Sequence, residues 1–138
     1  MNPPLPITEI RIKFIPHSEH RYTTCGDWLY LDDPEGGKVL EIRVSKMTDQ
    51  RYSQMVAVHE LVEVILCNQQ GVTQEEVDEF DKAYEASRVE DNEGEPGDEP
   101  NAPYRDQHCF ATAVERMLCA ALGISWVEYE QAINNLFE

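Results

Sequence analysis

Residues Met55 to Leu66 read MVAVHELVEVIL, and this stretch decides the fold of the 138-residue chain. Its apolar residues are spread over the whole circumference of a helix, which predicts a central and mostly buried helix. His59, Glu60 and Glu63 nevertheless lie within it. An unpaired carboxylate in such surroundings is costly, so each of these side chains needs a partner, a cleft or a proton.

The spacing of these polar residues indicates a metal site. His59 and Glu63 are four residues apart, so they share one helix face with their β-carbons about 6 Å apart. An imidazole nitrogen and a carboxylate oxygen placed in this way can bind one metal ion at about 2.0 to 2.2 Å. Glu60 is rotated by about 100° from His59, where it can face a metal-bound water as the general base of the HExxH motif does. The simpler interpretations are a His59–Glu63 ion pair in the core and a solvated Glu60.

Alternating apolar and polar residues before this stretch predict strands. Residues 7–15 (ITEIRIKFI) and 39–44 (VLEIRV) both alternate, and Trp28 and Tyr30 mark a third strand before a turn at 32–37. We therefore expect a small antiparallel sheet of about three strands.

Helical signals dominate the rest of the chain. Thr48 or Asp49 is a good N-cap for a helix that runs through Gln70 and ends at Gly71. Three further helices are predicted at about 73–87, 104–122 and from 125 to the C-terminus. The prediction for residues 1–138 is a single α+β domain with strands first and four helices after them.

Charge restricts the function. The chain has 27 acidic and 11 basic residues, a net charge of −16, which argues against nucleic-acid binding, because Lys and Arg neutralise the phosphates there. No apolar run reaches the roughly 20 residues that cross a bilayer, and residues 1–6 lack a signal-peptide start, so we expect a cytoplasmic protein without membrane contacts. Residues 89–103 (VEDNEGEPGDEPNAP) are predicted to be an acidic, flexible loop.

The H-E-x-x-E pattern at 59–63 resembles the motif of the zincin-like metallopeptidases, with Glu63 in place of the second metal-binding histidine. The order of a short sheet, a motif helix and later helices is also similar to small zincins. In the gluzincin branch, two His and one Glu bind zinc, and the third ligand comes from a later helix. Here His108 would complete that set with His59 and Glu63. The resemblance leaves Glu115, about two turns further on, as an alternative ligand or as a group that orients the surroundings of His108.

The resemblance implies a zinc-dependent hydrolase, a peptidase acting on peptide or protein substrates, of the kind that phages and bacteria encode as stand-alone proteins. Glu60 would be its general base, and the acidic loop before His108 would cover the cleft. Two alternatives stay open: a catalytically inactive zincin-fold protein in which the site is structural, and an acidic phage-type inhibitor that mimics nucleic acid. The sequence leaves the oligomeric state open.

Overall fold

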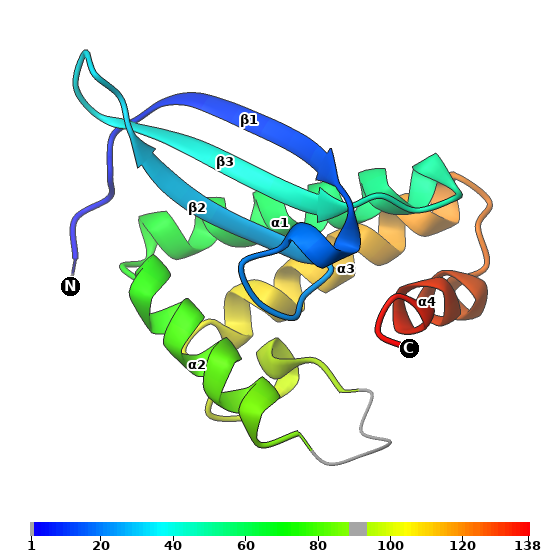
Figure 1. Cartoon of the computed structure of the whole chain (residues 1–138). Coiled ribbons are helices and arrows are strands. Elements are labelled where there is room, and N and C mark those ends of the chain that lie inside the picture. The colour runs from blue at the N-terminus through cyan, green and yellow to red at the C-terminus, as the bar shows by residue number, and fades with distance from the viewer. Residues whose placement is uncertain (1, 89–93) are drawn as a thin grey trace.

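The computed structural model describes residues 2–88 and 94–138, and its sheet has three strands (Figure 1). They are β1 (Ile7–Ile15), β2 (Gly26–Asp32) and β3 (Lys38–Ser45), in the order β1-β3-β2. β2 and β3 form an antiparallel hairpin, whose turn contains Gly36 and Gly37 at positive φ.

The pairing of β1 corrects the expected antiparallel sheet, because β1 runs parallel to β3. Alternating residues determine which side chains share a face, but they do not determine which strands are neighbours. Residues 16–25 turn the chain back, yet it is β3, the second arm of the hairpin, that lies beside β1. The hairpin reverses direction once more, so β3 points the same way as β1. The prediction of three strands is confirmed, and the sheet is mixed.

Four helices follow the sheet, as predicted, and the fold is α+β. Asp49 caps the first helix through its side chain, and Thr73 and Glu76 form the capping box of the second. None of the described helices is by itself long and apolar enough to cross a membrane, although the third and fourth, bent by 118°, reach that length and composition as a pair. The helices are α1 (Gln50–Gln69), α2 (Gln74–Ala86), α3 (Arg105–Ala121) and α4 (Trp126–Asn135), and the short 3-10 turns are η1 (His17–Glu19) and η2 (Pro96–Asp98).

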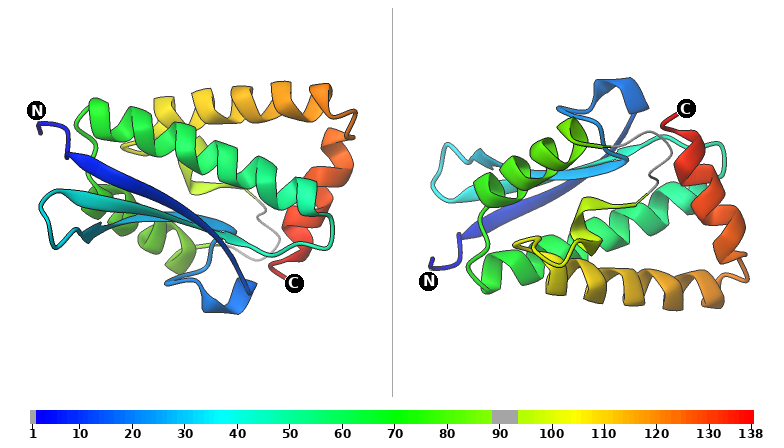
Figure 2. Two further views of the ribbon diagram at one scale, coloured as in Figure 1. Left: turned by 90° about the horizontal axis from the view of Figure 1, so that it is seen from above. Right: turned by 90° about the horizontal axis from the view of Figure 1, so that it is seen from below.

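One face of the sheet is covered by a helix. α1 packs against β2 and β3, and α3 lies alongside α1 (Figure 2). The core lies between the sheet and α1, where burying apolar side chains provides most of the driving force for folding. Its central members are Trp28, Leu40, Ile42, Val44, Met55, Val56, Val64 and Cys67, all less than 5% exposed.

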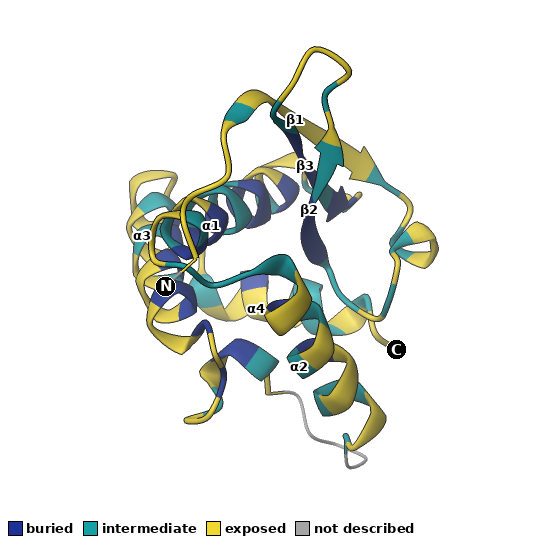
Figure 3. Ribbon diagram, turned by 90° about the vertical axis from the view of Figure 1, so that its left-hand side faces the viewer, coloured by how far each residue is buried: buried dark blue, intermediate teal, exposed yellow. Residues whose placement is uncertain are grey.

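α1 is central and mostly buried, as its composition predicts, but one of its sides is open. His59, Glu63 and Val64 are buried, but Ile65 is 48% exposed and Val58 is half-buried. The sheet covers one side of α1 and α3 covers another, while the third side faces outward. β1 is likewise exposed along most of its length (Figure 3).

The acidic segment after α2 contains two buried residues. Residues 89–93 lie outside the described residues, so the prediction of a flexible loop is not tested there. In the described part, Gly97 and Ala102 are buried, and η2 places Gly97 against the ring of His108. The rest of this part faces solvent, since residues 98, 100 and 101 are exposed, and the flexible loop stays a prediction.

Candidate metal centre

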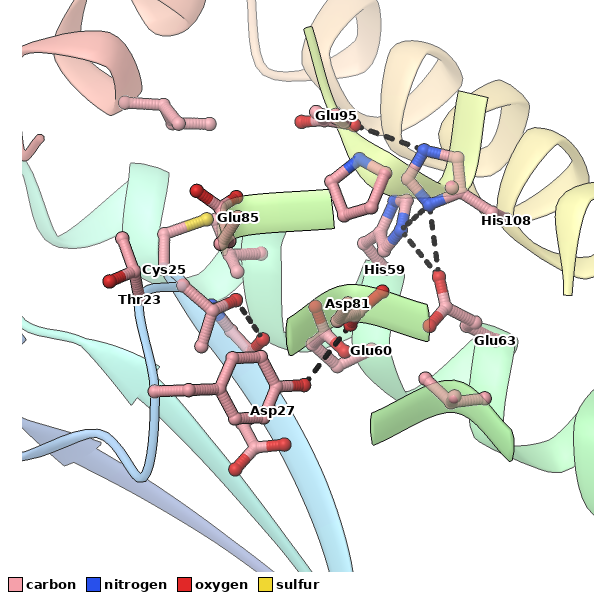
Figure 4. Close-up of a pocket in the computed structure, with 18 of the residues that line it drawn as sticks. Thr23, Cys25, Asp27, His59, Glu60, Glu63, Asp81, Glu85, Glu95 and His108 are labelled. Atoms are coloured by element: carbon pink, nitrogen blue, oxygen red, sulfur yellow. Dashed lines mark hydrogen bonds and ion pairs between the residues drawn. The ribbon is translucent and has the colours of Figure 1, made fainter. Parts of the chain in front are cut away.

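Three side chains from two helices bring their ligand atoms together (Figure 4). His59 Nε2 lies 3.1 Å from Glu63 Oε2 and 3.2 Å from His108 Nδ1, and the last two atoms are 3.1 Å apart. α1 supplies His59 and Glu63 from successive turns, and the first turns of α3 supply His108. All three residues are at most 7% exposed. They form a buried group that could hold a metal ion.

The geometry of this group fits a metal. Bonds of about 2.0 to 2.1 Å in a tetrahedral site place neighbouring ligand atoms roughly 3.3 Å apart, close to the three distances between these atoms. Two imidazole nitrogens and a carboxylate oxygen are also a ligand set typical of zinc. Such atoms repel one another at this distance unless a proton or a cation lies among them. The sequence-predicted residues His59, Glu63 and His108 are thus brought together.

Glu115 holds the far side of His59. His59 Nδ1 lies 2.8 Å from Glu115 Oε1, and Tyr129 donates its hydroxyl hydrogen to the other oxygen of Glu115. With its Nδ1 hydrogen donated to Glu115, the ring directs the lone pair of Nε2 at Glu63 and His108. Glu115 therefore lies outside the group of ligand atoms, and it orients His59 rather than the surroundings of His108.

Two carboxylates flank the far side of His108. Its Nε2 lies 3.0 Å from Glu95 Oε2 and 3.3 Å from Asp98 Oδ1, although the ring is not aimed straight at either oxygen. Burial lowers the pKa of His108, but the Asp98, Glu63 and Glu95 carboxylates outweigh it and raise the pKa well above its ordinary value. Gly97 lies on the ring, where a β-carbon would be 2.4 Å from His108 Cγ.

Trp28 fixes the orientation of Glu63. Its Nε1 donates a hydrogen bond to Glu63 Oε1 at 3.2 Å, which leaves Oε2 to face the two histidines. Burial raises the pKa of Glu63, but hydrogen bonds with His108 and His59 outweigh it and lower the pKa to about 2. Glu63 is thus ionised, as a metal ligand has to be.

Glu60 lies beside the group, on the wall of a cavity of about 690 Å³ that His59, Glu63 and His108 also line. Its carboxylate packs against β2, where a β-carbon at Gly26 would lie 2.5 Å from Glu60 Oε1. Burial, together with the nearby Glu63, raises the pKa of Glu60 well above its ordinary value.

The cavity wall is strongly acidic (Figure 4). Asp27 is paired with Arg21 at 2.8 Å, whereas Asp81 accepts hydrogen bonds from Tyr22, at 3.1 Å, and from Tyr104. Burial raises the pKa of Asp81 to about 7. The sequence analysis missed Trp28, Glu95, Gly97, Asp98 and Asp81, because no spacing pattern links any of them to the residue that it contacts.

Comparison with known protein families, curated proteins and solved structures finds no match for this chain. The resemblance to the zincins rests on residues 59–63, on His108 and on the order of the elements, and it stays a prediction.

Proposed function

We propose that this protein is a zinc-dependent hydrolase that cleaves peptide bonds, with His59, Glu63 and His108 as zinc ligands and Glu60 as general base. One observation carries the proposal: the three ligand atoms lie 3.1 to 3.2 Å apart on the wall of a cavity that Glu60 also lines. A three-residue ligand set leaves a fourth position for water, as catalytic zinc sites do, whereas structural sites are closed by four residues.

The chemistry divides between the ion and the chain. Zinc bound to such a set lowers the pKa of a bound water to near 7 and polarises a carbonyl oxygen. Glu60 accepts the proton of the attacking water on its carboxylate and returns it to the leaving amine. Glu115 keeps His59 in the required tautomer, and Trp28 keeps Oε2 of Glu63 turned toward the ligand group.

The position of β2 supports an extended peptide as substrate. β2 is an edge strand, and its residues Gly26, Asp27 and Trp28 line the cavity beside Glu60. A peptide can add to such an edge through backbone hydrogen bonds. The volume of about 690 Å³ is within the usual range of roughly 300 to 1,000 Å³ for ligand sites.

Metal analysis tests the ligand assignment. Protein purified without added metal is expected to contain about one zinc per chain, and His59→Ala and His108→Ala are expected to lose it. His17→Ala is the matched control, because His17 bonds Ser45 outside the group and should leave the zinc content unchanged. Equally little metal in all four proteins would show that the ligand assignment is wrong.

Glu60→Gln tests catalysis separately. The variant should keep its zinc and its fold but lose cleavage of an unstructured peptide mixture, read by mass spectrometry, by at least a hundredfold. Zinc in both proteins with no cleavage by either would favour the inactive, structural alternative. Inhibition of a nucleic-acid enzyme that is lost only when the acidic residues between 75 and 99 are neutralised would instead favour the nucleic-acid mimic.

A further inference from the structure

β1 is an open edge of the sheet. It pairs only with β3 among the described strands, so its other edge presents free backbone N–H and C=O groups. Seven of its nine residues are exposed, and only Ile7 and Ile15 are half-buried. A long, exposed edge strand is a template for pairing with another strand.

The apolar face of β1 is also uncovered. Ile10, Ile12 and Phe14 are 40 to 47% exposed. Their partners on β3 are nevertheless buried: Leu40, Ile42 and Val44. The two strands differ in exposure because α1 packs over β2 and β3 and reaches little of β1. These side chains extend the core face of the sheet beyond the edge of its helical cover.

The uncovered face continues across the helices. Ile65 of α1 is 48% exposed, and on α3 the side chains of Phe110 and Met117 are 58% and 65% exposed. β1, α1 and α3 run side by side in the left view of Figure 2. Ile65 is rotated by about 200° from Glu63 around α1, so this face is turned away from the cavity. Exposed apolar patches of this extent mark interaction sites.

We propose that a second copy of this chain covers the face, with the two β1 strands paired antiparallel about a two-fold axis at Arg11. In that register, Glu9 of each copy lies opposite Lys13 of the other, and Ile10 lies opposite Ile12. Opposite charges and β-branched residues are the favourable cross-strand pairs. The two Arg11 side chains face each other, and each has Glu9 of its own chain 2.7 Å away as counter-charge.

The distribution of charge permits this pairing despite the net charge of −16. Residues 71–100 carry 12 acidic and 2 basic side chains, and they begin with α2, on the side of the molecule away from β1 (Figure 1). Residues 7–15 carry Glu9 against Arg11 and Lys13, a net charge of +1. The edge that would pair thus lacks the negative charge that elsewhere in this acidic protein repels a second copy.

The two-fold axis gives the interface a defined shape. The two-fold axis is perpendicular to the sheet. The two three-stranded sheets then form one sheet of six strands, with both α1 helices on the same face. A closed pairing of this kind also protects the edge from further association.

Sedimentation equilibrium tests the dimer. The wild type should be dimeric at micromolar concentration, and Ile12→Lys should raise the dissociation constant at least tenfold, because it places two charges at the dyad. Ile12 is 44% exposed, so the variant should fold, with unchanged helical circular dichroism. Val127→Lys, at a 75% exposed apolar residue of α4, is the matched control and should stay dimeric. Removing metal with a chelator should leave the dimer intact.

Hydrogen exchange distinguishes the strand interface from others. The outward N–H groups of residues 8–14 should be protected in the wild type and exchange quickly in Ile12→Lys. A monomeric wild type at 100 micromolar, or a monomer that binds only a different protein, would overturn the proposal. So would a dimer that survives Ile12→Lys and is lost in Met117→Lys, because that result would place the contact on α3 alone.

Discussion

Gly97→Ala should weaken zinc binding without unfolding the protein. The new methyl group would lie 2.4 Å from His108 Cγ and 2.6 Å from Nδ1, whereas the optimal separation of non-bonded carbon atoms begins at about 3.5 Å. The ring or the turn must therefore move by roughly 1 Å, whereas the distance from zinc to a ligand atom can change by only about 0.2 Å. Gly97 is not among the glycines with positive φ, so alanine adds no backbone strain there.

The expected loss of zinc affinity is about 10- to 100-fold, or about 1.4 to 2.8 kcal/mol, as for other changes to groups that hold a metal ligand. Competition with a chromophoric zinc chelator measures it. Gly26→Ala is the matched control: its methyl group would lie 2.5 Å from Glu60 Oε1 and touch no ligand, so it should keep its zinc and lose cleavage. Wild-type zinc affinity in Gly97→Ala would refute this account of how His108 is held.

Three further changes test the groups around the site. Glu115→Gln keeps an acceptor for His59 but removes its charge, so zinc affinity measured by chelator competition should fall by about tenfold; no change would mean that Glu115 is not needed to hold His59. Trp28→Phe removes the donor to Glu63, and urea unfolding should show a loss of about 1 to 3 kcal/mol. Burial raises the pKa of Asp81 from 3.8 to about 7, so its stabilising contribution is complete below pH 4 and is lost as the pH rises through 7. Asp81→Asn should remove about 4 kcal/mol of the pH dependence of the free energy of unfolding. If the free energies of wild type and variant differ by the same amount at pH 4 and at pH 8, this prediction is wrong.

The ligand group could be predicted because its signals are local. His59 and Glu63 are one helical turn apart, so their spacing alone places them on one face. Within the resemblance, His108 was the remaining candidate for the third ligand, because the two histidines other than His59 and His108 lie in the first 20 residues. The outer contacts gave no such signal: Trp28 reads only as an apolar strand residue, although its indole holds Glu63 from 35 residues away.

Composition does not reveal contacts that depend on single residues. The acidic segment that contains Gly97 faces solvent over most of its described part, yet the contact of Gly97 with the ring of His108 gave no signal in the sequence. The direction of β1 was also beyond reach, because alternation assigns faces and not neighbours. Both features depend on which segments become neighbours in space, which local patterns do not determine.

The apolar composition of α1 has three causes rather than one. Val64 and Cys67 face the core, and His59 and Glu63 are the polar exceptions on the side that meets α3. Ile65 belongs to neither side, and neither the core nor the metal site accounts for it. The other exposed residues on this third side, Arg51, Gln54 and Gln69, are polar, so Ile65 is the exposed apolar exception there. In the proposed dimer, the second copy paired along β1 would cover Ile65, and a contact between copies would then account for this exception.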